Sequence, residues 1–315
     1  MSDLDCCVCH GPAGPGAREL GGRWYCAAHY ERATSDRHGV WQAGAAEVVG
    51  LLVLVGLVEF IVGVAQPRLE GAGLLVASVT IALVPAAVWL SFFYQQDRLE
   101  PEPKGYVLAV FVLGGLLAAA VGLPLTQSLF RTQERLGLGL WGDVLGSILA
   151  VGFAYELLKY AAVRYFVYPL DEFDGRVDGI VYGAAAGLGF ATAMNIHYVV
   201  QSGGVDLGAG IIHVVVTALA QASFAGVTGY FVGGLKFERR PVWWMPAGLS
   251  LAAALNGIFT FLAGPLTHGG YTPWPGLVVP TTMAMAVFGA LNVLIRRANR
   301  QALPDGDAAL AEGGQ

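Results

Sequence analysis

The sequence is poor in charge: only 13% of its 315 residues are Asp, Glu, Lys or Arg, whereas 55% are hydrophobic. A soluble domain carries about a quarter charged residues, so this composition, with a mean hydropathy of +0.58, is that of a membrane protein. The formal net charge is -5, and the sequence has no basic run or aromatic stacking platform. We therefore expect no nucleic acid partner.

Cysteine is absent after residue 26, because all four cysteines lie at positions 6, 7, 9 and 26. The first 40 residues are polar, so no signal peptide is expected. The sequence has no convincing internal repeat. The small, acidic segment 299–315 is predicted to be a disordered cytoplasmic tail.

Long apolar runs fill most of the remaining sequence. A helix needs about 20 apolar residues to cross the hydrocarbon core of a bilayer. Eight runs of this kind are predicted to be transmembrane helices: 46–65, 73–93, 106–123, 143–163, 179–200, 209–233, 243–263 and 275–295. Glycine-rich stretches such as "GAAAGLGFA" (183–191) would let neighbouring helices approach closely. The predicted fold class is therefore all-α, a polytopic membrane bundle of about eight helices.

The distribution of Lys and Arg predicts the orientation of this bundle. Cytoplasmic loops usually carry an excess of Lys and Arg. If the N-terminus is inside, the loops that hold most of the basic residues of this sequence are the cytoplasmic ones. Arg68, Arg131 and Arg135 fall outside, and Lys159 falls within the membrane. The sequence thus predicts a multi-pass protein of the cell (inner) membrane, with the N- and C-termini cytoplasmic.

The cysteine-rich stretch predicts a structural zinc site. Cys6 and Cys9 form one Cys-x2-Cys pair, and Cys26 and His29 form a second pair sixteen residues later. Four such donors suit tetrahedral zinc and leave no open position for chemistry. Cys7 is an alternative to Cys6, and free thiols on a disordered tail are the alternative to a metal site. We expect residues 1–40 to form a zinc-knuckle-like cytoplasmic module and residues 41–298 to form the transmembrane bundle.

A carboxylate and an ammonium lie in the middle of one apolar run. In "AYELLK" (154–159), Glu156 and Lys159 are three residues apart and can pair along a helix. The pair could fix the register of the bundle, or Glu156 could be a general base that Lys159 tunes. The other polar residues expected to be buried are Glu59, Asn195, His197, His213, Gln221, Asn256 and Asn292.

Three stretches resemble one family. "DRLEPEP" (97–103), "DEFDGRVDGIVYGAAAGLGFA" (171–191) and "SFAGVTGYFVGG" (223–234) are similar to segments of the PrsW family of intramembrane proteases. The resemblance covers about residues 97–261 and leaves the cysteine-rich N-terminus outside. It implies an active site made of four short motifs on successive helices.

The first two implied motifs are only partly retained. In the first, Glu156 and Lys159 remain, but Tyr155 replaces a glutamate. In the second, "FATAMN" (190–195), the phenylalanine and Asn195 match, but Met194 stands where the family has an acid.

The last two implied motifs have lost their histidines. Gln221 in "QASF" (221–224) and Asn256 in "NGIFTF" (256–261) occupy those positions, and Thr260 replaces an aspartate. Amides and thioethers bind divalent metals poorly compared with imidazole or carboxylate. A rearranged site that uses His197 or His213 is the alternative, but both histidines are expected near the outer helix ends, far from Glu156.

These substitutions lead to a pseudoprotease as the first hypothesis: a membrane protein that binds a transmembrane helix of a partner or substrate protein without cutting it. No catalytic metal is expected. One alternative, implied by the resemblance, is an active endopeptidase that uses Glu156 for site-1-type cleavage of membrane-anchored regulators such as anti-sigma factors. Another is a small-solute or proton-coupled transporter with Glu156 and Lys159 as a charge relay, although no inverted repeat supports it.

Overall fold

The structure, a computed structural model, describes most of the chain as helix. The described residues are 5–6, 9, 11–20, 23–34, 38–65, 70–96, 102–128, 139–202, 207–268 and 273–301. The predicted disordered tail lies almost entirely outside them. Two strands and a helix come first, namely β1 (Arg18–Leu20), β2 (Arg23–Tyr25) and α1 (Ala27–Thr34). The long helices follow as α2 (His38–Ala65), α3 (Gly71–Gln96), α4 (Lys104–Leu117), α8 (Arg176–Gln201), α9 (Leu207–Phe237), α10 (Trp244–His268) and α11 (Pro273–Gln301).

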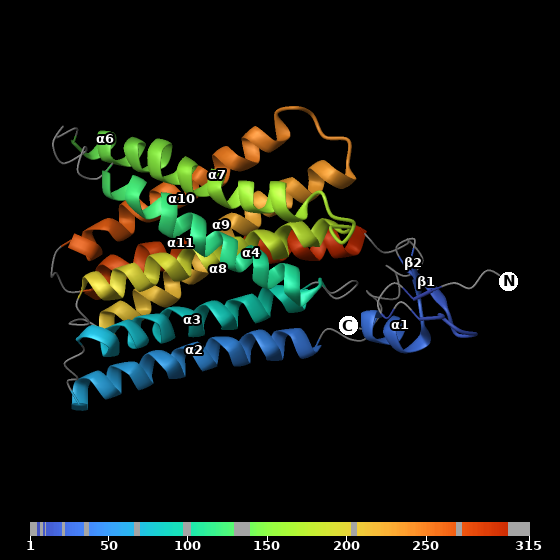
Figure 1. The fold of residues 1–315 in the computed structure, drawn as a ribbon, viewed down its shortest axis with the longest axis horizontal. Helices are drawn as coiled ribbons and strands as arrows, with labels where there is room; N and C mark the ends of the chain where they lie inside the picture. The colour runs from blue at the N-terminus through green and yellow to red at the C-terminus, as the bar shows by residue number, and fades with distance from the viewer. Residues whose placement is uncertain are drawn as a thin grey trace.

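Two of the membrane-spanning helices contain π-helical turns. The α4 helix continues through η1 (Ala118–Gly122) to residue 128. A second continuous helix consists of α6 (Gly139–Gly146), η2 (Ser147–Gly152), α7 (Phe153–Ala162) and η3 (Val163–Val167). Figure 1 shows these helices lying side by side, with the small N-terminal module beyond one end of the bundle.

The predicted membrane bundle is confirmed. Seven of the described helices are long and apolar enough to cross a membrane, and they match the last seven predicted runs. The first predicted run, 46–65, lies in α2, whose described apolar stretch is Val49–Ile61. The antiparallel β1–β2 hairpin in the N-terminal module was not predicted.

The helices α8 and α9 form the centre of the bundle. In their apolar windows 83% and 89% of the residues are buried, against 28–33% in the other five spans. The two helices meet backbone to backbone: a Cβ on Gly179, Gly183 or Gly187 would stand 2.2–2.4 Å from a carbonyl oxygen of α9. Because no side chain fits there, glycine at every fourth residue fixes how closely α8 and α9 pack.

The helix that carries Glu156 is positioned by a second glycine contact. A Cβ on Gly152 would lie 2.1 Å from the carbonyl oxygen of Ala253 in α10, and one on Gly257 would lie 2.3 Å from the Cα of Ile148. The turn before Glu156 and the turn that contains Asn256 are therefore in direct backbone contact. This contact brings two of the four implied motifs together.

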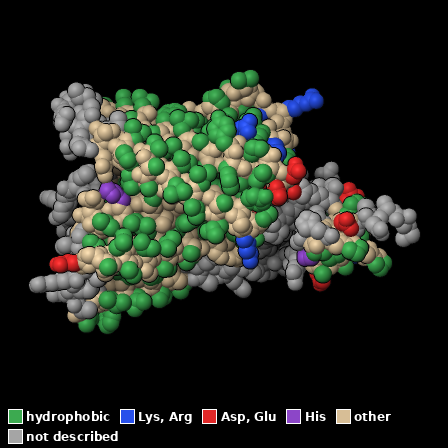
Figure 2. Space-filling view, viewed as in Figure 1, with side chains coloured by type: hydrophobic (Ala, Val, Ile, Leu, Met, Phe, Trp, Pro, Cys, Tyr) green, Lys and Arg blue, Asp and Glu red, His purple; other side chains and the backbone are tan. Residues whose placement is uncertain are grey.

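Charged side chains gather at one end of the bundle (Figure 2). Lys236, near the end of α9, donates hydrogen bonds to the carbonyl oxygens of Tyr168 (2.9 Å) and Leu170 (3.1 Å). At the same end, Glu238 forms ion pairs with Arg176 and Arg240. Figure 2 shows Lys, Arg, Asp and Glu side chains at the bundle end beside the N-terminal module.

One residue predicted to be buried is exposed. Glu59 lies on α2, a peripheral helix that buries Leu51 and leaves Leu52, Val53 and Phe60 exposed. Hydropathy locates a helix in a sequence but does not show which of its faces packs against neighbours, so the prediction for Glu59 was wrong.

We expect both termini to be cytoplasmic, because the bundle end rich in Lys and Arg should face the cytoplasm. A tag at either terminus should be inaccessible to an impermeant reagent in intact cells and accessible after permeabilisation. A cysteine introduced at position 131 or 135 should be labelled in intact cells. Labelling of the N-terminal tag from outside would contradict this orientation.

Candidate functional site

The best-developed polar site lies around Glu156 in α7. Glu156 is eleven residues before Val167, where the continuous helix ends, which is about 16 Å at 1.5 Å per residue. The side chains of Glu156, Gln221 and Asn256 are completely buried, and that of Lys159 is 1% exposed. Polar groups at such a depth need partners inside the protein, because lipid offers none.

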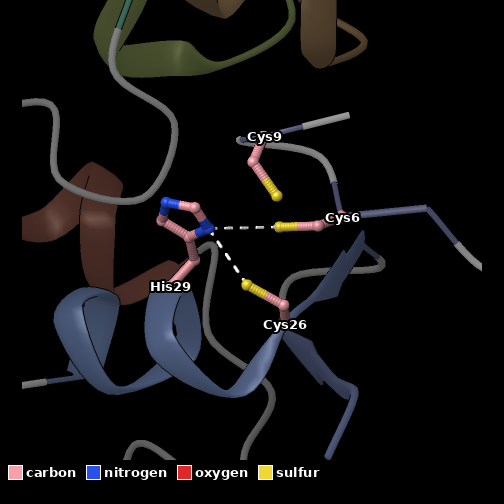
Figure 3. Close-up of side chains that lie close together, drawn as sticks. All are labelled: Cys6, Cys9, Cys26 and His29. Carbon is pink, nitrogen blue, oxygen red and sulfur yellow. Dashed lines mark hydrogen bonds between the residues drawn. The ribbon is translucent and has the colours of Figure 1, made fainter. Parts of the chain in front are cut away.

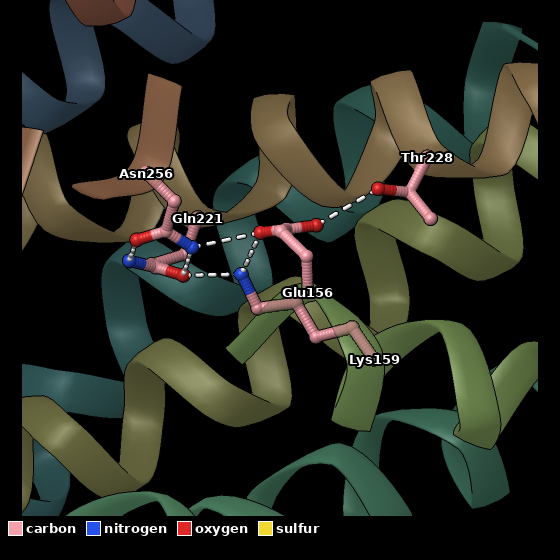
Figure 4. A network of polar contacts seen from close by, with 5 residues as sticks. All are labelled: Glu156, Lys159, Gln221, Thr228 and Asn256. Atoms are coloured by element: carbon pink, nitrogen blue, oxygen red, sulfur yellow. Dashed lines mark hydrogen bonds and ion pairs between the residues drawn. The ribbon is translucent and has the colours of Figure 1, made fainter. Parts of the chain in front are cut away.

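These side chains form one connected network (Figure 4). Lys159 Nζ donates to Glu156 Oε1 at 2.6 Å and also to Gln221 Oε1. Asn256 Nδ2 donates to Glu156 Oε1 at 2.7 Å, and Thr228 Oγ1 donates to Glu156 Oε2 at 2.9 Å. Three helices, α7, α9 and α10, supply every member of the network.

The two amides form a reciprocal pair. Gln221 Nε2 donates to Asn256 Oδ1 at 3.1 Å, and Asn256 Nδ2 donates to Gln221 Oε1 at 3.2 Å. The orientation of Asn256 follows from chemistry, since its amide oxygen turned toward Glu156 would face another acceptor. The Glu156 carboxylate thus accepts from an ammonium, an amide and a hydroxyl, three of the roughly four hydrogen bonds that a carboxylate can accept.

The phenylalanine of the second implied motif covers the lysine. Lys159 Nζ lies 5.2 Å from the centroid of the Phe190 ring, within the range of a cation–π contact. Because the ammonium also donates to Glu156 and Gln221, its charge is contacted by polar and aromatic groups. The network is therefore well satisfied inside the bundle.

Tyr155 and Met194 lie in a separate apolar cluster rather than in the network. The Tyr155 ring is 4.6 Å from that of Phe190, centroid to centroid, and Met194 packs against the same cluster. Tyr155 Oη forms a hydrogen bond with Thr126 Oγ1. Thr126 already donates to the carbonyl of Gly122 at 2.8 Å, so the phenol is the donor. The two positions where the family has acids are thus filled by packing residues.

The remaining candidates are not brought to Glu156. Asn195 donates from Nδ2 to the carbonyl oxygen of Val214 at 3.1 Å. The His197 ring nitrogen Nε2 lies 3.1 Å from Gln127 Nε2. The His213 ring packs 4.4 Å from the Tyr198 ring. Within the described residues, neither histidine joins the network.

Sequence reasoning missed Thr228. Its hydroxyl is the only hydrogen-bond partner of Glu156 Oε2 within the part of the chain that the structure describes. A signal for it existed: Thr228 lies seven residues after Gln221, and that spacing places both residues on one face of a helix. A small hydroxyl in an apolar helix usually bonds to its own backbone, so the spacing alone did not distinguish the two cases.

A second site lies in the N-terminal module. The ligand atoms of Cys6, Cys9, Cys26 and His29 all lie within 4.8 Å of one another (Figure 3). His29 Nδ1 is 3.1 Å from Cys26 Sγ and 3.5 Å from Cys6 Sγ. Neighbouring donors on tetrahedral zinc lie about 3.5–3.8 Å apart, given zinc–nitrogen and zinc–sulfur bonds of about 2.0 and 2.3 Å. These four residues could therefore hold a metal ion, whereas Cys7 lies outside the described residues.

Local structure brings the four donors together. The backbone N–H of Cys6 donates to the carbonyl of Gly11 at 2.8 Å, which closes the loop that contains Cys9. Cys26 follows β2, and His29 is in the first turn of α1. Gly14 has a φ of +71°, a left-handed conformation that glycine adopts without strain, in the turn before β1.

The charges of the thiols also suit a cation. The backbone hydrogen bond with Gly11 lowers the pKa of Cys9, but the neighbouring thiols of Cys6 and Cys26 raise it, and the resulting pKa lies above the ordinary value. Thiolates this close together repel one another. A bound divalent cation would remove that repulsion and favour the ionised thiols.

Comparison with known proteins identifies relatives of the bundle. Residues 102–291 match the family model described as "PrsW family intramembrane metalloprotease". The chain is 31% identical over 208 residues to Protease PrsW of Bacillus subtilis, which covers 64% of this chain and 89% of that protein. It is 30% identical over 196 residues to Protease PrsW of Geobacillus kaustophilus, covering 61% and 82% of the two chains. No solved structure matches the chain.

The network predicts a coupling between Glu156 and Lys159. Glu156→Ala should destabilise the bundle by about 3–5 kcal/mol, because it leaves Lys159 buried without its carboxylate. Glu156→Ala combined with Lys159→Met should be less damaging than Glu156→Ala alone. The measurement is the free energy of unfolding in detergent, with the lipid-exposed Leu157→Ala on the same helix as control. Equal or greater damage in the double variant would show that the two residues are not coupled.

Proposed function

The chain belongs to the PrsW family of intramembrane metalloproteases, and we propose that it is a pseudoprotease of that family. In this proposal the bundle binds a transmembrane segment of a partner protein and does not hydrolyse it. The observation that carries the proposal is the contact between Asn256 Nδ2 and Glu156 Oε1 at 2.7 Å. An amide N–H₂ group points at the carboxylate from a position where the family resemblance implies an imidazole.

The geometry explains why this substitution matters. Positions 156, 221 and 256 converge on one point, since their side chains are hydrogen-bonded to one another or to Lys159. A glutamate and two histidines at such positions would be a donor set suited to a catalytic zinc. Here two of the three residues are amides, whose nitrogen has no free lone pair for a metal. The residues present therefore do not fit a catalytic metal.

The carboxylate is also poorly placed to act alone. A general base must accept a proton from a water molecule within hydrogen-bonding reach. Glu156 is completely buried and accepts three hydrogen bonds from Lys159, Asn256 and Thr228. Only about one of its four acceptor positions is left for an attacking water, and burial keeps that position away from bulk water, which supports a structural role for the pair.

The proposed binding role rests on what the chain retains. The relatives are named as proteases, and the family description places their activity in the membrane. The chain has a glycine-packed bundle, and residues that the resemblance implies for catalysis are replaced at positions 155, 194, 221 and 256. A protein that keeps the scaffold and loses the chemistry can still recognise a helix in the bilayer.

The second candidate is an active endopeptidase. Its support is the retention of Glu156 beside Lys159, with a carboxylate at the point where the other motif positions converge. Such an enzyme would cut membrane-anchored regulatory proteins and would use Glu156 as its base.

Cleavage assays separate the two candidates. The purified chain in proteoliposomes should cut no member of a library of single-span substrates, as judged by mass spectrometry of the products. Glu156→Gln is the matched control because it keeps the shape of the side chain. Any cut that wild type makes and Glu156→Gln does not make would rule out the pseudoprotease.

For the N-terminal module, we propose a structural zinc held by Cys6, Cys9, Cys26 and His29. Thiolates and imidazole are the ligands that zinc prefers, and four protein ligands leave no open position for a substrate. The spacing of the donors supports this assignment. On this proposal, the metal holds together a small module that lies at the cytoplasmic face and serves for docking.

Metal analysis tests both sites in one experiment. The purified wild-type chain should contain one zinc ion, and Cys9→Ser combined with Cys26→Ser should contain none while the bundle stays folded. Gln221→His combined with Asn256→His should raise the content to two, because it would restore an imidazole pair beside Glu156. Zinc retained by the cysteine variant would reveal a site in the bundle and favour the active enzyme.

A further inference from the structure

The peripheral helix α2 carries an exposed carboxylate within its apolar stretch. Glu59 lies within the apolar stretch Val49–Ile61 and is exposed. It is six residues, or about 9 Å at 1.5 Å per residue, before the last residue of the helix, Ala65. Its neighbour Val58 packs against the apolar cluster of Val199 in α8 and Val214 in α9, so this part of α2 lies alongside the spans of those helices. Glu59 is therefore at membrane depth.

Nothing in the described part of the chain compensates this charge. No described residue forms an ion pair with Glu59 or donates a hydrogen bond to it. Ionisable groups within transmembrane segments almost always face the interior of a bundle and pair there. An exposed one indicates that the described chain lacks part of the structure that surrounds it.

The surface around Glu59 is shaped for a second helix. Leu52, Gly56 and Glu59 are four and three residues apart and so lie on one side of α2. Leu52 is 64% exposed, and a Cβ on Gly56 would meet no other atom within 4 Å. A glycine beside an acidic side chain lets another helix approach closely enough for a polar contact. We name Leu52, Gly56 and Glu59 the α2 face.

We propose that the α2 face binds a transmembrane helix of another protein that carries a lysine or arginine. The charge selects this occupant, because a cation both pairs with the carboxylate and removes the cost of exposing it to lipid. A second copy of this chain fits poorly. In the described spans the only Lys or Arg away from the charged end of the bundle is Lys159, which is buried and already paired with Glu156.

This site is separate from the Glu156 network. The α2 helix precedes residues 102–291, which match the family, so the α2 face is not part of the matched bundle. It also follows the N-terminal module directly in the chain. A partner bound at α2 would therefore lie next to the helix that connects the module to the bundle, whether or not the bundle cleaves anything.

The test measures association of defined single-span peptides with the full-length chain. Leu/Ala helices carry one guest residue, Lys, Leu or Glu, six residues from the outer end. Energy transfer between labelled peptide and labelled protein in liposomes reports binding. The Lys peptide should bind about three- to thirtyfold more tightly than the Leu peptide, the range expected for polar contacts between membrane helices.

Two variants assign the effect to Glu59. Glu59→Leu should abolish the preference for the Lys peptide, and Glu59→Lys should transfer it to the Glu peptide. Leu57→Ala, at an exposed position on the other side of α2, should leave the preference unchanged. Thermal unfolding of each variant checks that the bundle is intact, and the charge reversal tests recognition without relying on a loss of binding.

Two results would overturn the proposal. Equal binding of the Lys and Leu peptides would mean that Glu59 reaches the membrane surface by itself and selects no helix. Energy transfer between two differently labelled copies of the chain, lost in Glu59→Leu, would mean that the α2 face is a contact between copies. The proposal is supported if wild type prefers the Lys peptide and the Glu59→Lys variant prefers the Glu peptide.

Discussion

The close approach of helix backbones at glycine is the constraint on which this structure depends. Between α8 and α9, glycine at every fourth position leaves room only for backbone atoms. The contact between η2 and α10 works in the same way through Gly152 and Gly257. In lipid, helices gain nothing by hiding apolar side chains, so close van der Waals packing has to hold them together. It also determines which polar side chains can reach one another.

The polar network follows from that packing. Once α7, α9 and α10 are fixed, Glu156 and Lys159 cannot reach water, and each needs the other. This dependence gives a physical reason to keep the ion pair whether or not the site is catalytic, because loss of either member would leave a buried charge. Gln221 and Asn256 keep the hydrogen-bonding capacity of the site. They do so without supplying a proton acceptor or a good metal ligand.

The segments before residue 102 add two features to the family bundle. One is the module with its Cys and His cluster, and the other is α2 with Glu59 on its exposed side. They adjoin in sequence, and neither contributes to the Glu156 network. In the proposed arrangement the module provides a site outside the membrane, and the α2 face provides one within it. Together they suit a protein whose role is to hold partners, which agrees with the proposed loss of catalysis.

The sequence by itself determined the class of fold, because the length and hydropathy of a segment are enough to identify a membrane-spanning helix. It also identified the four metal-ligand candidates by their spacing, and the Glu156–Lys159 pair, whose members are one helical turn apart. These features are local. The packing of different helices decided the rest, and hydropathy does not report the rotation of a helix about its axis. Only the tertiary structure joined Thr228 to Glu156, separated Tyr155 and Met194 from the network, and left Glu59 exposed.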